Sequence, residues 1–243
     1  MTNALFAFAF GFLPAAVAAG TLAGIGWWFR PPRYGIHAFL AGAIGASFVA
    51  LAGLMVFRQA TAFLGETIQF TLIWLVYGPV AEETVKVVFL AGLVGWAVHR
   101  GEAWKENWAL YGALVGLGLA GAEGFVLLFE ETEQEWTMTQ LLTRWLGTAQ
   151  MHALATAVAG LMLGLGQGYG RVFPVFHLGG GLAAAIMVHG LWNCVAGGLY
   201  ATESAGFTGP GLWLMGVMLF GSTVGLVVAG EVVIKKKERY FLT

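Results

Sequence analysis

Residues 67–98 read TIQFTLIWLVYGPVAEETVKVVFLAGLVGWAV, an apolar run that Glu82, Glu83 and Lys86 interrupt near its middle. About 20 apolar residues are enough to cross the hydrocarbon layer of a bilayer, so this run is long enough to span it. A charged side chain at that depth costs at least about 2.5–3.5 kcal/mol on insertion scales. Three such charges in one span indicate that the membrane interior holds a functional site.

The composition places the whole chain in the membrane class. Of 243 residues, 58% are hydrophobic and 10% are charged, and the mean hydropathy is +0.77. Soluble proteins carry about 25% charged residues, so the surplus apolar surface has to face lipid. The 37 glycines fit closely packed membrane helices. We therefore expect an all-α polytopic membrane protein in contact with the lipid bilayer.

Two simple counts restrict the other properties of the chain. The formal net charge of −1 gives no indication of nucleic-acid binding. Cys194 is the only cysteine, so no disulfide can form within the chain. The sequence contains no indication of the oligomeric state.

Hydropathy predicts about seven transmembrane helices, which together form a single membrane-embedded domain over residues 1–243 with its motif-bearing core at about 67–200. The predicted spans are residues 4–29, 34–57, 67–98, 108–129, 139–166, 178–200 and 211–234. Pro79 lies inside the third and longest span and lacks a backbone N–H. We therefore expect that helix to be kinked or broken near Pro79, with a short helix before it.

The distribution of basic residues predicts the orientation, because cytoplasmic loops are enriched in lysine and arginine. Two basic residues, Arg58 and Arg144, flank one set of span ends. The opposite set carries Arg30, Arg33, Arg100, Lys105, Arg171, Lys235, Lys236, Lys237 and Arg239. We expect a multi-pass protein of the cell membrane with its C-terminus in the cytoplasm and its N-terminus outside.

Four further polar residues fall inside predicted spans, at a depth similar to that of the first cluster. These residues are Glu123, His152, His189 and Asn193. Polar groups that serve one site must share a depth, whereas independent polar defects would scatter along the helices. The sequence thus predicts that Glu82 or Glu83 meets these four residues in one polar site.

This set of residues favours water activation over a nucleophilic mechanism, because no nucleophilic serine or cysteine is evident. A buried glutamate is a suitable general base. A histidine and an amide on one helix face, such as His189 and Asn193, can form an oxyanion hole. Zinc held by glutamate and histidine is the less favoured rival, since the HExxH motif is absent, so we expect no cofactor. Two interpretations require no enzyme. In one the charged residues form a structural ion network, and in the other the protein is a proton-coupled transporter.

Four segments resemble, in order, the motifs of the PrsW family of intramembrane proteases, which is related to the type II CAAX prenyl proteases and to bacteriocin-processing membrane proteins. The segments are PVAEETVK (79–86), GLGLAGAE (116–123), MHALATAVAG (151–160) and HGLWN (189–193). Their order and spacing hold over roughly residues 77–198, about half of the chain. Each segment is weakly specific alone, and their order makes the resemblance strong.

The resemblance implies a glutamic-type membrane peptidase (a hydrolase) that cleaves a single-pass or membrane-anchored protein. Glu82 would activate water, assisted by Glu83 or Glu123 and by His152, and Lys86 would fix the carboxylate pair. His189 and Asn193 would hold the scissile carbonyl. The family's substrate would be an anti-sigma factor, cleaved on its extracytoplasmic side in a signal-transduction pathway.

Two positions depart from the family pattern. Leu119 stands where an aromatic residue is usual, and Gly124 where asparagine often follows the glutamate. These departures leave the role of Glu123 and the substrate preference open. CAAX-type or peptide-processing activity, with or without zinc, is the alternative enzyme reading, although CAAX proteases have histidine where Glu123 stands.

Overall fold

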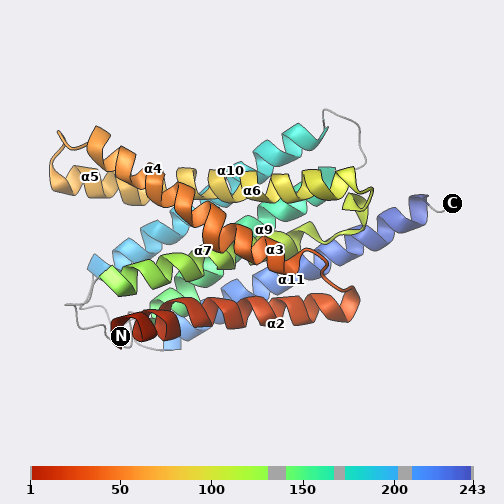
Figure 1. Cartoon of the computed structure of the whole chain (residues 1–243), viewed down its shortest axis with the longest axis horizontal. Coiled ribbons are helices and arrows are strands. Elements are labelled where there is room, and N and C mark those ends of the chain that lie inside the picture. Colours follow the sequence, from red (N-terminus) through yellow and green to blue (C-terminus); the bar gives the residue numbers. More distant parts are fainter. Residues whose placement is uncertain (1, 131–140, 167–172, 202–209, 242–243) are drawn as a thin grey trace.

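The computed structural model describes residues 2–130, 141–166, 173–201 and 210–241 (Figure 1). These residues form long helices that run roughly along one axis, and the two chain ends lie at opposite ends of the bundle. No strand occurs among the described residues. The all-α fold class predicted from composition is confirmed.

Every predicted span corresponds to helix where the structure describes it, apart from Tyr34, which lies in the turn before α3. The first three spans are each built from three consecutive elements: α1 (Thr2–Ala7), η1 (Phe8–Phe12) and α2 (Leu13–Phe29); α3 (Gly35–Leu40), η2 (Ala41–Ala46) and α4 (Ser47–Ala60); α5 (Glu66–Leu72), η3 (Ile73–Tyr77) and α6 (Gly78–His99). The remaining spans are α7 (Trp108–Glu130), η5 (Thr143–Thr148) with α9 (Ala149–Gly166), α10 (Phe173–Ala201) and α11 (Pro210–Phe241). A 3-10 turn, η4 (Ala103–Lys105), precedes α7. Residues 139 and 140 of the fifth predicted span lie outside the described residues.

By length and composition, six helices among the described residues can cross a membrane: Ala4–Phe29, Gly35–Ala60, Trp108–Phe129, Arg144–Gly166, Phe176–Ala196 and Leu214–Lys236. The protein is therefore a multi-pass membrane protein. The third predicted span is not among the six. It is helical from Glu66 to His99 and carries the three charges near its middle, so its crossing of the bilayer stays a prediction.

Pro79 does not break the third span. The chain passes through the π-helical segment η3 directly before Gly78 and Pro79, which open α6. A π segment places each amide one residue further from its acceptor than an α-helix does, and such segments are frequent at functional sites. The expected short helix before Pro79 is α5, joined to α6 through η3 rather than separated from it.

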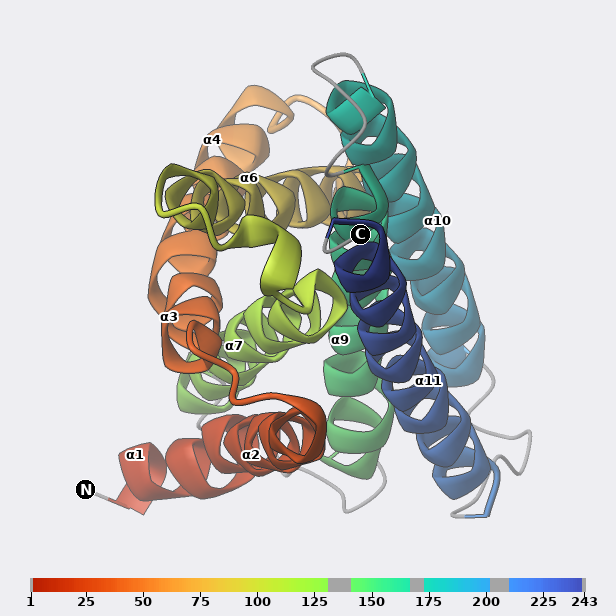
Figure 2. The ribbon, with the colours of Figure 1, turned by 90° about the vertical axis from the view of Figure 1, so that its right-hand side faces the viewer.

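Helix α7 lies at the centre of the bundle. Seen from one end (Figure 2), α7 and α9 are surrounded by α2, α3 with α4, α6, α10 and α11. All residues of α7 from Trp108 to Ala120 are buried. Small residues make this depth of packing feasible, because Gly112 and Gly116 of α7 lie against the backbone carbonyls of Thr156 and His152 of α9.

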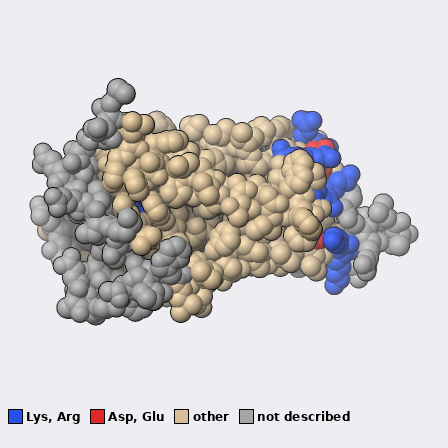
Figure 3. All heavy atoms as spheres, turned by 90° about the horizontal axis from the view of Figure 1, so that it is seen from below, with Lys and Arg blue, Asp and Glu red and all other residues tan. Residues whose placement is uncertain are grey.

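Lysine and arginine side chains gather at one end of the molecule, visible at the right of Figure 3. That end contains the connection before α3 and the connection before α7, which bind each other. Arg33 forms an ion pair with Glu102 at 2.7 Å, and the Tyr34 hydroxyl donates to Glu102 at 2.7 Å. The hydrogen bond from Tyr34 and the nearby arginines hold the pKa of Glu102 below its ordinary value. Burial, by contrast, raises the pKa of Glu106.

Candidate active site

The two adjacent glutamates of α6 have different surroundings. Neighbouring residues on a helix point about 100° apart, so Glu82 and Glu83 cannot face the same way. Glu83 and Lys86 are fully buried, whereas the side chain of Glu82 is 23% exposed. The structure therefore separates one carboxylate that is enclosed in the protein from one that is accessible.

Glu83 is the centre of a buried hydrogen-bond network. It forms a close ion pair with Lys86, and one of its oxygens lies 2.8 Å from Nδ1 of His189. The Thr156 hydroxyl lies 3.4 Å from the other oxygen and 3.0 Å from the backbone carbonyl of His152, and its single proton is shared between these two acceptors. A carboxylate only accepts hydrogen bonds, so Nδ1 of His189 carries a proton and Nε2 is the nitrogen left for a ligand. Glu83 thus orients His189 rather than facing a substrate.

His152 of α9 is held on both sides of its ring. Its Nδ1 lies 2.9 Å from the Lys86 ammonium, and its Nε2 lies 3.2 Å from Oε2 of Glu123 on α7. An ammonium group can only donate, so Nδ1 accepts and the ring proton sits on Nε2, from which it is donated to Glu123. The side chain of Glu123 is 34% exposed, so this end of the network is accessible.

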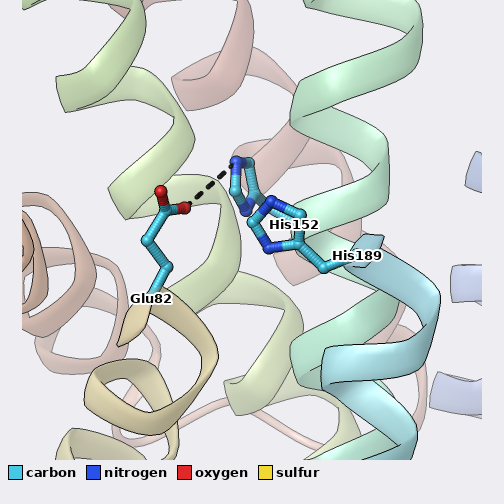
Figure 4. A group of neighbouring side chains, drawn as sticks. All are labelled: Glu82, His152 and His189. Carbon is cyan, nitrogen blue, oxygen red and sulfur yellow. Dashed lines mark ion pairs between the residues drawn. The ribbon is translucent and has the colours of Figure 1, made fainter. Parts of the chain in front are cut away.

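Glu82, His152 and His189 converge from α6, α9 and α10 (Figure 4). The Glu82 carboxylate points toward the His152 ring, with Oε2 3.9 Å from Nε2. The two imidazole rings meet edge to face with their centroids 4.9 Å apart. Oε2 of Glu82 is buried and makes no hydrogen bond within the described part of the chain. The triad therefore presents one carboxylate oxygen that is available for an additional ligand.

The same three residues fit a metal ion. One donor atom from each lies within 4.8 Å of the other two. Two histidines and one glutamate are the ligand set of several catalytic zinc sites. Binding through Nε2 of His152 would, however, move the ring proton to Nδ1, and Lys86 would then accept that hydrogen bond as a neutral amine. The donor types fit a metal, whereas the lysine favours the metal-free tautomer.

Asn193, the seventh predicted site residue, has a different environment from the other six. It lies one helical turn after His189 on α10 and is buried. Its side-chain amide donates to the backbone carbonyl of Trp74 at 2.7 Å, and the Trp74 indole donates to the carbonyl of Asn193 at 2.9 Å. The structure thus joins Glu82, Glu83, Lys86, Glu123, His152 and His189 in one network and places Asn193 beside it, bound to η3.

Two residues of this region were not predicted from the sequence, Thr156 and Trp74. Thr156 follows His152 by four residues, so it shares a helix face with the histidine, and that spacing was the available signal. Trp74 had no such signal, because nothing in the sequence distinguishes it from the other nine tryptophans. Its role depends on a contact with a residue 119 positions away.

Comparison with known proteins gives one match. The model of the PrsW family intramembrane metalloproteases matches residues 30–223, from the connection before α3 into α11. No curated protein and no solved structure shows a significant match to the chain. The family match covers most of the chain and includes all seven residues discussed above. The buried carboxylate–histidine network and this match agree that the chain belongs to the PrsW family of intramembrane metalloproteases and is a membrane-embedded peptidase.

Proposed function

We propose that the protein hydrolyses a peptide bond of a single-pass or otherwise membrane-anchored protein, with Glu82 activating the attacking water. The observation that carries the proposal is the position of Glu82 Oε2, which is buried, 3.9 Å from His152 Nε2, and without a hydrogen bond among the described residues. A general base must have an oxygen that is free to accept the proton of water. Oε2 of Glu82 meets this condition, whereas Oε1 of Glu83 is bound by Lys86 and His189, and Oε2 of Glu83 is enclosed beside Thr156.

In the proposed reaction, Glu82 takes a proton from water while the water oxygen bonds to the carbonyl carbon of the substrate. His189 donates from Nε2 to the developing oxyanion in its doubly protonated form, while the Glu83 carboxylate accepts from Nδ1 and orients the ring. Glu82 then passes the proton to the leaving amine as the carbon–nitrogen bond breaks. His152, held between Lys86 and Glu123, keeps the Glu82 side of the site in place.

A metal-dependent reaction is the second candidate, favoured by the donor set and by the family's description as metalloproteases. Glu82, His152 and His189 would hold the ion, which when bound supplies a Lewis acid that activates water and polarises the carbonyl. Glu83 would then fix the ring orientation of one histidine ligand, the usual task of a carboxylate behind a metal-bound histidine. This candidate differs from the metal-free expectation and requires Lys86 to release a proton.

We propose further that the substrate is an anti-sigma-factor-like protein cleaved on the extracytoplasmic side, with the C-terminus of the enzyme in the cytoplasm. The clustering of basic side chains at one end of the molecule supports this orientation (Figure 3). The presence of Glu123 beside His152, where CAAX proteases have a histidine, makes the prenyl-protein branch the weaker alternative.

The experiment that tests the function is cleavage in liposomes. The purified protein is co-reconstituted with a library of single-pass membrane proteins, and new protein N-termini are identified by mass spectrometry. We expect new termini with the wild-type protein and at least about 10²-fold fewer with Glu82→Gln, which keeps the side-chain volume and removes the base. A proton-coupled transporter would give no new termini with either protein, and that result would overturn the proposal.

A further inference from the structure

Pro79 leaves one backbone carbonyl of η3 without its regular helical donor. At the end of the π segment, the Gly78 amide donates to the carbonyl of Ile73, five residues earlier. In this register the next amide, at position 79, would donate to the carbonyl of Trp74. Proline has no N–H, so the main chain supplies no donor at position 79.

A side chain from α10 supplies the missing donor. The Asn193 amide donates to the Trp74 carbonyl at 2.7 Å, and the Trp74 indole returns a hydrogen bond to the Asn193 carbonyl at 2.9 Å. Both distances lie within the usual range of N–H···O hydrogen bonds. Pro79 and Asn193 are buried, so water does not replace this bond freely. The side-chain amide of Asn193 therefore supplies the hydrogen-bond donor that Pro79 lacks.

This pair of hydrogen bonds joins the two helices that carry the halves of the site. Asn193 follows His189 by four residues on α10, and Trp74 precedes the glutamate pair on the continuous η3–α6 helix. His189 and Glu83 meet at 2.8 Å between the same two helices. The Asn193–Trp74 bond lies one turn from the His189–Glu83 contact along α10 and nine residues from it along η3–α6, and a bond between two helices restricts their rotation and sliding against each other.

We infer that Pro79, Trp74 and Asn193 form a clamp that sets His189 against Glu83, so that Asn193 is a positioning residue. This inference rests on the proposed function for its catalytic consequence and on the hydrogen bonds alone for its structural part. The resemblance to the PrsW family implies another role, in which the Asn193 amide contacts the scissile carbonyl. The two roles make different predictions when Pro79 is replaced.

A double-mutant cycle with Asn193→Ala and Pro79→Ala separates the two roles. Alanine at position 79 adds an N–H, and in either an α or a π register the Trp74 carbonyl then has a main-chain donor. For a clamp, Asn193→Ala removes this donor from the partly buried Trp74 carbonyl and lowers both the melting temperature and the turnover number, the latter by about 10-fold. Both losses should be smaller when Pro79→Ala is also present.

The KM of a cleaved substrate provides the third readout, after melting temperature and turnover number. If Asn193 is instead an oxyanion donor, Asn193→Ala lowers kcat equally with and without the Pro79→Ala substitution and leaves KM and melting temperature unchanged. That result would overturn the clamp. Recovery of the melting temperature without recovery of turnover would overturn the positioning role. The melting temperatures need no substrate, so they test the clamp even if the protein proves not to be a peptidase.

Three matched variants complete the design. Trp74→Phe removes the returned hydrogen bond and part of the packing of the indole against the core, so it should lower turnover in the same direction and provides a second variant if Asn193→Ala fails to fold. Trp28→Phe, at a largely exposed position, should change nothing. Asn107→Ala removes another buried amide, which donates to the carbonyl of Val227. Its effect should add to that of Pro79→Ala without any rescue, because the two sites do not share a partner.

Discussion

Replacement of Lys86 by methionine tests whether the network is a buried ion pair or an incidental contact. The lysine side chain is fully buried, pairs closely with Glu83, and lies 2.9 Å from Nδ1 of His152. Methionine fills a similar volume but leaves the Glu83 carboxylate buried without its cation. The removal of one partner from a buried pair costs about 3–5 kcal/mol.

The expected change in thermal stability follows from this figure. For a chain of this size, each kcal/mol shifts the melting temperature by about 2–4 °C, so Lys86→Met should lower it by roughly 6–20 °C. The double variant Lys86→Met with Glu83→Gln should lose less than the single variant, because it buries a neutral amide in place of an unpaired charge. Turnover should fall in both variants, since His152 loses the donor at Nδ1 in each of them. In the double variant His189 also loses the Glu83 carboxylate.

The assay is thermal unfolding in one detergent at one scan rate, with turnover measured on the same samples. Lys236→Met is the matched control, because Lys236 is exposed at the end of α11 and its removal should leave stability within about 0.5 kcal/mol. A loss of less than about 1 kcal/mol for Lys86→Met is typical of surface pairs. Together with a double variant no more stable than the single one, it would refute the buried-pair interpretation.

Three further predictions concern the metal, the packing of α7 and the basic end of the molecule. Exhaustive chelation should leave turnover intact if Glu82 alone activates water. The metal-dependent reaction would be established instead if elemental analysis finds stoichiometric zinc and if chelation abolishes turnover that zinc alone restores. Gly116→Val should lower both stability and turnover, because its side chain would collide with the backbone carbonyl of His152, whereas Gly92→Val, with open space around it, should be tolerated in circular-dichroism melts and activity assays. Glu106→Gln should flatten the pH dependence of the melting temperature. Burial raises the folded-state pKa of Glu106, so the stability that this carboxyl contributes is full below its ordinary pKa of 4.5 and is lost as the pH rises through the folded-state pKa. A wild-type melting temperature that rises steeply over this pH window, with no change in Glu106→Gln, would contradict the raised pKa.

The amino-acid sequence by itself determined the membrane class, the helix positions and the identity of the polar residues. Hydropathy averaged over about 20 residues is a local property, so the spans could be placed within a few residues of the observed helices. Spacing along one helix is also local, and it correctly predicted that Lys86 would reach the glutamate pair. Seven polar residues were predicted to meet because they lie at a similar depth in the predicted spans, and six of the seven lie in one network in the structure.

Only the tertiary structure decided how these residues divide their tasks. The sequence could not distinguish Glu82 from Glu83, because that choice depends on how α6 is rotated against α9 and α10. It could not place Asn193 against Trp74, a contact across 119 residues, or His189 against Glu83, across 106. Rotation and axial offset between helices are set by which small residues allow close approach, and this depends on the whole bundle at once. Hydropathy thus predicted that the charges lie in the membrane, and the packing of α6 against α9 and α10 determined which of them meet.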